Sequence, residues 1–70
     1  MNETVTPYAQ IEDSTGLTAS VYLMDNLVHE VHYKDKSGKK FFTEKFEMIP
    51  IEVVEKMAND WATGNRKIAV

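Results

Sequence analysis

The sequence contains no cysteine. Disulfide bonds, thiolate metal ligands and a cysteine nucleophile are therefore excluded. A chain without cysteine fits a reducing compartment, so we expect a cytoplasmic protein.

Glycine and proline are scarce, with three and two residues respectively. This scarcity excludes a collagen-like chain and gives no glycine-rich loop of the kind that binds phosphate. No apolar run approaches the roughly twenty residues that span a membrane, so no membrane association is expected.

The composition is typical of one small globular domain. The 70 residues are 43% hydrophobic and 27% charged, with a formal net charge of −3. We predict a single domain over residues 1–70. A core of this size rarely contributes more than about 3–5 kcal/mol to the free energy of unfolding. Binding to a second copy, most simply as a homodimer, or to another protein is therefore expected.

Four segments with alternating or β-rich patterns predict strands at residues 4–12, 17–24, 27–34 and 40–48. The Asp25-Asn26 pair predicts a two-residue hairpin turn, because both residues tolerate a positive φ. In the last strand Phe42, Phe46 and Met48 are expected to face the core. Glu44 interrupts that alternation and predicts a bulge or a strand end nearby.

Residues 50–63 are predicted to form an amphipathic helix, with Pro50 in its first position and Gly64 just beyond its end. A short tail, 65–70, follows. The apolar stripe of this helix comprises Ile51, Val54, Met57, Ala58 and Trp61, and Trp61 is expected in the core. The predicted fold class is α+β: a four-stranded antiparallel β-meander with one C-terminal helix packed on one sheet face.

The string from His29 to His32 contains two histidines beside a glutamate, the residue types of a zinc protease site. Such a site needs the histidines four apart on a helix, whereas these are three apart in a predicted strand and point to opposite faces. No other spacing predicts a metal site, a cofactor site or a catalytic residue, so we do not expect an enzyme or a small-molecule substrate.

The sheet face opposite the helix is the candidate protein interface. Five apolar residues are expected there: Tyr8, Tyr22, Met24, Val28 and Phe41. Exposed apolar patches of aromatic residues and methionine are typical of interaction surfaces.

A second hypothesis concerns the basic hairpin. Residues 34–45 carry five lysines against two carboxylates, a local charge of +3: Lys34, Lys36, Lys39, Lys40 and Lys45. Lysines beside aromatic residues are able to follow a phosphate backbone and stack bases. The alternative explanation is that they keep a hairpin and an edge strand soluble, which the net acidic chain favours.

The sequence therefore predicts a small non-catalytic protein-interaction module that binds itself or a protein partner through the open sheet face. A regulatory or accessory role suits such a chain, including that of a phage or mobile-element protein. The alternative is a single-stranded nucleic-acid-binding module that uses the basic hairpin.

Overall fold

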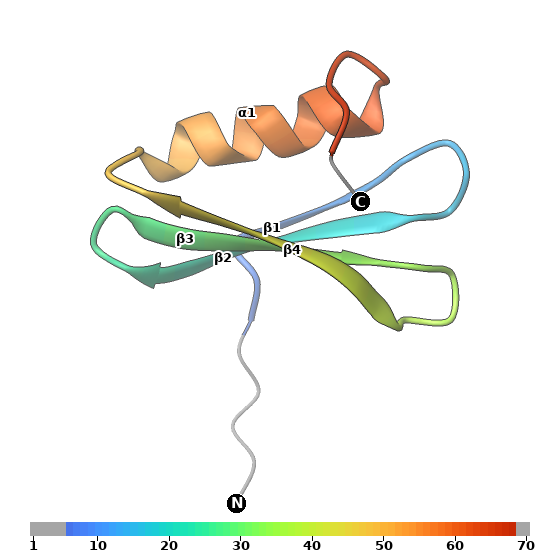
Figure 1. Ribbon diagram of the computed structural model, residues 1–70, viewed down its shortest axis with the longest axis horizontal. Helices are drawn as coiled ribbons and strands as arrows, with labels where there is room; N and C mark the ends of the chain where they lie inside the picture. The colour runs from blue at the N-terminus through green and yellow to red at the C-terminus, as the bar shows by residue number, and fades with distance from the viewer. Residues whose placement is uncertain (1–5, 69–70) are drawn as a thin grey trace, which may run out of the picture.

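The computed structural model describes residues 6–68. Four strands lie side by side in chain order: β1 (Ala9–Glu12), β2 (Thr18–Asp25), β3 (Val28–Lys34) and β4 (Lys40–Glu47). Neighbouring strands are antiparallel, and helix α1 (Ile51–Ala62) lies across one face of the sheet (Figure 1). The predicted α+β meander with one C-terminal helix is confirmed.

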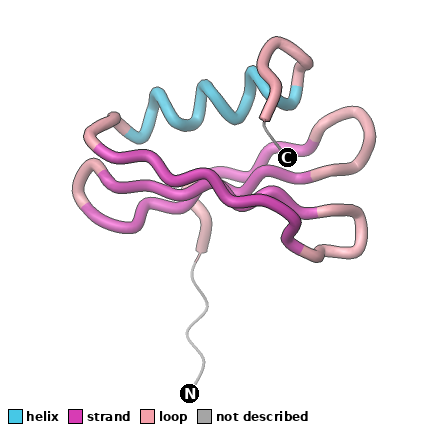
Figure 2. Tube along the Cα trace, in the orientation of Figure 1, coloured by secondary structure: helices cyan, strands magenta, loops and turns pink. Residues whose placement is uncertain are grey.

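The hydrophobic core lies between α1 and the sheet face that the helix covers (Figure 2). Its fully buried members are Ala19, Val21, Val31, Tyr33, Val54 and Ala58. Trp61 packs against this core, as predicted, and so does Ile68 from the segment after the helix. The helix packs mainly on β1, β2 and β3, so the side of the sheet formed by β4 is covered less by α1.

The two ends of α1 follow different local rules. Pro50 is the N-cap, with ψ at 148°, and Ile51 is the first helical residue, which corrects the prediction that Pro50 occupies the first helical position. At the other end Gly64 takes a φ of 87°, as its predicted place after the helix requires.

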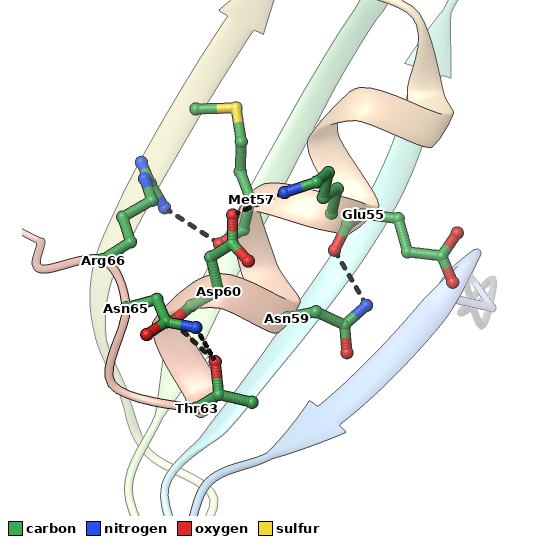
Figure 3. Close-up of polar contacts among 8 residues, drawn as sticks. Glu55, Met57, Asn59, Asp60, Thr63, Asn65 and Arg66 are labelled. Carbon is green, nitrogen blue, oxygen red and sulfur yellow. Dashed lines mark hydrogen bonds and ion pairs between the residues drawn. The ribbon is translucent and has the colours of Figure 1, made fainter.

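The chain leaves the helix through a tight set of hydrogen bonds. The N–H of Gly64 donates to the carbonyl of Trp61 (3.1 Å), and the N–H of Asn65 donates to that of Asp60 (2.8 Å). The Asn65 amide also donates to the Thr63 hydroxyl (Figure 3). This C-terminal motif turns the chain back toward the sheet and places Arg66 above it.

Two loops of the same design lie at the end of the sheet near the C-terminus of α1 (Figure 1). In one, Asp13 Oδ1 accepts hydrogen bonds from the Thr15 N–H, the Thr15 hydroxyl and the Leu17 N–H. In the other, Asp35 Oδ1 accepts them from the Ser37 N–H, the Ser37 hydroxyl and the Lys39 N–H. In each loop the hydrogen bonds favour the charged carboxylate and lower its pKa. For Asp13, desolvation acts in the opposite direction, but the hydrogen bonds together outweigh it.

The turn between β2 and β3 differs from the predicted one. Asn26 and Leu27 form it, one residue later than expected, because the register shifts between Leu23 and Asp25 and leaves Met24 as an extra residue. Asp25 then pairs with Val28, and Leu27 takes a φ of 62°.

Two expectations for the fourth strand are also wrong. Met48 does not face the core: it lies beyond β4, has a φ of 64° and is 79% exposed. The irregularity in β4 lies beside Phe41, not at Glu44, which pairs regularly with Val31. Phe42 and Phe46 do pack against the core, as predicted.

The first strand is shorter than predicted. It begins at Ala9, and residues 6–8 precede it, while residues 4 and 5 lie outside the described part of the chain. Residues 69–70 of the predicted tail lie outside it as well.

Candidate functional site

A polar cluster joins the segment after α1 to the sheet. The Tyr33 hydroxyl donates to Glu44 Oε1 (2.6 Å), and Arg66 donates to Glu44 Oε2 (2.5 Å) and to the Tyr33 oxygen (3.4 Å). Burial raises the pKa of Tyr33 well above its ordinary value, and the bond to Glu44 adds to this effect. Burial opposes the charge of Arg66, but its bonds to Glu44 and Tyr33 raise its pKa.

Aromatic rings surround the same cluster. Trp61 meets Tyr33 edge to face, with ring centroids 4.9 Å apart, and the Arg66 guanidinium lies 6.0 Å from the centre of the Phe46 ring. The charged and hydroxyl groups bind one another, so the cluster fastens the chain after α1 to β4.

The two histidines occupy opposite faces of β3, as their spacing predicts. His29 is buried on the helix side, where its Nε2 donates to the carbonyl of Ile49 (2.7 Å), while Nδ1 has no partner within residues 6–68. His32 lies on the open face and contacts Glu30 (2.8 Å). Across the described residues no three histidine, aspartate or glutamate side chains gather as metal ligands.

The open face has a polar centre, as expected from the alternation that places Ser20 and His32 on this face. Ser20 is fully buried there, and its hydroxyl accepts a hydrogen bond from Gln10 (3.1 Å). Beside it the ring of Tyr22 lies 4.6 Å from that of His32. These contacts interrupt the apolar face.

The structure separates the predicted interface residues into two groups. Tyr8, Tyr22, Met24 and Val28 lie in the half of the face toward the β2–β3 hairpin, since Tyr22 is opposite Glu30 and Val28 opposite Glu47. Phe41 lies in the other half, next to the Lys34–Lys40 pair. Tyr8, Met24 and Phe41 are exposed, whereas Tyr22 and Val28 are half-buried.

Other exposed apolar residues belong to the end of the sheet where the β2–β3 hairpin lies beside the connection from β4 to α1 (Figure 1), two segments that the Met48–Leu27 hydrogen bond joins. We call this exposed surface the apolar end, and it comprises Leu23, Met24, Leu27 and Met48. Leu23 and Met24 are 55% and 52% exposed, and Leu27 is also exposed. The sequence pattern predicts Met48 in the core and Met24 in the candidate interface, and the structure places both on this exposed surface.

The backbone at the apolar end is strained. Leu27 and Met48 are the only non-glycine residues between 6 and 68 with a positive φ. Large side chains rarely adopt this conformation, which costs about 1–3 kcal/mol per residue and is concentrated at functional sites. Here the strained backbone leaves the Leu27 and Met48 side chains exposed, so packing in the core does not explain why these two residues adopt a positive φ.

Acidic residues border the apolar end. Asp25 belongs to the hairpin, Glu47 lies opposite Val28, and Glu52 lies in the first turn of α1. Lys45 contacts Glu47 at 3.7 Å, and both side chains are mostly exposed. The surface therefore combines exposed apolar groups with negative charge.

The five candidate lysines do not form one continuous surface. Lys36 bends toward the β1–β2 loop, where its side chain approaches Gly16 so closely that a Cβ there would lie 2.8 Å from Lys36 Cε. Lys45 lies far along β4, opposite Glu30 and beside Glu47. Lys34, Lys39 and Lys40 remain near the tip of the β3–β4 hairpin, with Phe41.

No protein-family model, curated protein or solved structure matches this chain. Within residues 6–68 there is no helix with the length and hydrophobicity needed to span a bilayer.

Proposed function

We propose that this chain is a cytoplasmic, non-catalytic protein-interaction module with a regulatory or accessory role, and that its partner binds at the apolar end. The observation that carries the proposal is the pair of strained, exposed residues Leu27 and Met48, linked by a hydrogen bond of 2.7 Å between the Met48 N–H and the Leu27 carbonyl. Val28, from the open face, lies beside this surface and extends it.

The chemistry of the surface indicates its partner. Apolar side chains would fill the space around Leu23, Leu27 and Met48, and lysine or arginine side chains would match the carboxylates at the border. Fully burying one large apolar side chain contributes about 1.5–3 kcal/mol, so a few such contacts yield useful affinity after the entropy cost of association. Complementary charge at the rim mainly favours the association rate and the choice of partner.

The experiment compares immobilised wild-type protein with two variants. Met24→Glu combined with Met48→Glu adds charge to exposed positions and should leave the fold intact, because both side chains are solvated. The control, Lys36→Gln with Lys39→Gln and Lys40→Gln, alters the opposite end of the sheet. Retained proteins are identified by mass spectrometry, and each binding is then measured by calorimetry with purified components.

We expect a partner that binds wild-type protein and the lysine variant equally, and binds the methionine variant at least tenfold more weakly. Equal binding to all three proteins would place the interface away from the apolar end. Loss of binding in the lysine variant alone would move the protein interface to the β3–β4 hairpin. One observation favours the alternative function, single-stranded nucleic-acid binding: Phe41 is exposed next to Lys40.

A further inference from the structure

Strand β4 forms one edge of the sheet, and its outer side has no partner strand within residues 6–68 (Figure 1). It is eight residues long, whereas β1 at the other edge has four. The helix packs mainly on β1, β2 and β3 and leaves this edge open. Such an edge presents backbone groups that are ready to pair with another strand.

The hydrogen-bond pattern shows which backbone groups point outward. The bond from the Met48 N–H to the Leu27 carbonyl flanks the Val28–Glu47 pair, which identifies that pair as a non-hydrogen-bonded one. Hydrogen-bonded and non-hydrogen-bonded pairs alternate along an antiparallel ladder. Thr43, Lys45 and Glu47 therefore direct their N–H and C=O groups away from β3.

We propose that two copies of this chain join through β4, antiparallel and about a two-fold axis at Thr43, to form one continuous eight-stranded sheet. If the helices of both copies are to lie on the same face of the joined sheet, one residue of β4 must lie opposite its own copy at the axis. The choice among Thr43, Glu44 and Lys45 as that residue then follows from charge.

An axis at Glu44 would bring two carboxylates together, and an axis at Lys45 would bring two ammonium groups together. Like charges directly opposite one another destabilise a strand pair. An axis at Thr43 avoids both contacts. It places Thr43 opposite Thr43 and Lys45 opposite Phe41, where an ammonium group can lie over an aromatic ring.

The same arrangement agrees with the shape of the strand. The irregularity beside Phe41 limits regular pairing to residues 41–45 of each copy. These residues include two of the three whose backbone groups point outward, Thr43 and Lys45, and both side chains are exposed. Self-association is thus assigned to the β4 edge, while the apolar end of each copy stays free for another partner.

The test uses two substitutions at the axis and the full chain. Thr43→Pro removes an N–H that points outward and leaves the β3–β4 ladder intact, which an edge strand tolerates. Sedimentation at tens of micromolar should show a wild-type dimer and a Thr43→Pro monomer, with self-association weakened at least tenfold. Met24→Glu with Met48→Glu should remain dimeric, so a failure of the proposed function is distinguishable from a failure of this dimer.

A cross-link provides a measurement that does not depend on the proline variant folding. Because the chain has no cysteine, Thr43→Cys introduces a single thiol. At the axis two such residues lie about 5.5 Å apart between Cα atoms, within disulfide range. In this register Lys45 lies opposite Phe41 of the other copy, so two cysteines at position 45 are four residues apart along the strands, a distance of about 14 Å. Lys45→Cys should therefore not cross-link under the same oxidation.

A monomeric wild type overturns the proposal. So does a dimer that survives Thr43→Pro, or equal cross-linking of the two cysteine variants. A dimer that Tyr22→Lys with Val28→Lys abolishes and Thr43→Pro does not would place self-association on the open face of the sheet.

Discussion

The Met48 N–H donates a hydrogen bond to the Leu27 carbonyl at 2.7 Å, and both residues hold a positive φ, 64° and 62°. The bond extends the β3–β4 ladder by one step beyond the last pair, Val28 with Glu47. The connection to α1 and the β2–β3 turn are thereby fixed to each other. Because backbone strain is concentrated at functional sites, this pair of hydrogen-bonded residues supports the proposed binding role of the apolar end.

Met48→Gly should therefore stabilise the fold. Glycine adopts a positive φ without steric cost, and little apolar burial is lost because Met48 is 79% exposed. We expect the free energy of unfolding to rise by about 1 kcal/mol in urea denaturation, while binding to the partner weakens. Leu23→Gly is the matched control: it is also exposed and apolar but lacks a positive φ, and it should lower stability by about 0.5–1 kcal/mol. A loss of stability in both variants contradicts the prediction.

Arg66→Ala should lower the free energy of unfolding by about 2 kcal/mol. The Arg66–Glu44 pair is mostly buried, with side-chain exposures of 22% and 18%, so its loss falls between that of an exposed and a fully buried pair. Fluorescence of Trp61, the only tryptophan, reports unfolding in urea. Lys67→Ala, an exposed neighbour, should stay within about 0.5 kcal/mol of wild type. Equal effects of the two variants would mean that the cluster does not fasten the chain to β4.

The Tyr33 hydroxyl should govern stability at alkaline pH. Its pKa is raised in the folded state above its ordinary value of 10.0, because burial and Glu44 disfavour the phenolate. This contribution is complete below about pH 10 and is lost as the pH rises above that value. Tyr33→Phe should cost about 1–2 kcal/mol at pH 7, from the lost hydrogen bond to a carboxylate, and that deficit should shrink above pH 10.

Urea denaturation at a series of pH values measures this difference. Tyr8→Phe is the control, because Tyr8 is exposed, and its alkaline profile should run parallel to that of wild type. A deficit for Tyr33→Phe that stays constant from pH 7 to 11 would show that Tyr33 is not the group responsible.

The triple variant Lys36→Gln, Lys39→Gln, Lys40→Gln should fold and melt like wild type, because surface changes of this kind usually stay within about 0.5 kcal/mol each. We also expect neither protein to bind labelled single-stranded DNA or RNA in fluorescence anisotropy at physiological salt. Binding by wild type that the variant loses would establish the nucleic-acid alternative in place of the protein-interaction module.

The fold followed from the sequence wherever local pattern decides structure. Alternation in β2 and the apolar stripe of α1 depend on neighbours in the chain, and both were predicted correctly in outline. The role of Glu44 could not be predicted, because its partner Arg66 lies 22 residues away in the chain and no spacing rule connects the two. Only the folded chain shows why a carboxylate points toward the core.

The apolar end was missed for a related reason. Alternation assigns a face only while a strand continues, and β4 ends at Glu47, one residue before Met48. The turn at Asn26 and Leu27 was misplaced because leucine gives no signal for a positive φ, whereas Asp25 and Asn26 do. The Met24 bulge could not be read from a period-two pattern. The apolar end therefore lies where the strands are irregular or have ended, and there a repeating sequence pattern no longer predicts which side chains are exposed.

The order of strands in the sheet has a consequence for how the protein forms. Each strand pairs with the next one in the chain, so every hairpin closes a short loop at low entropy cost. The sheet is thus able to assemble while the chain is still being synthesised, and α1, which follows all four strands, covers it last. Until α1 docks, the apolar face of the sheet lacks its cover, so we expect the chain to be more prone to aggregation before this step than after it.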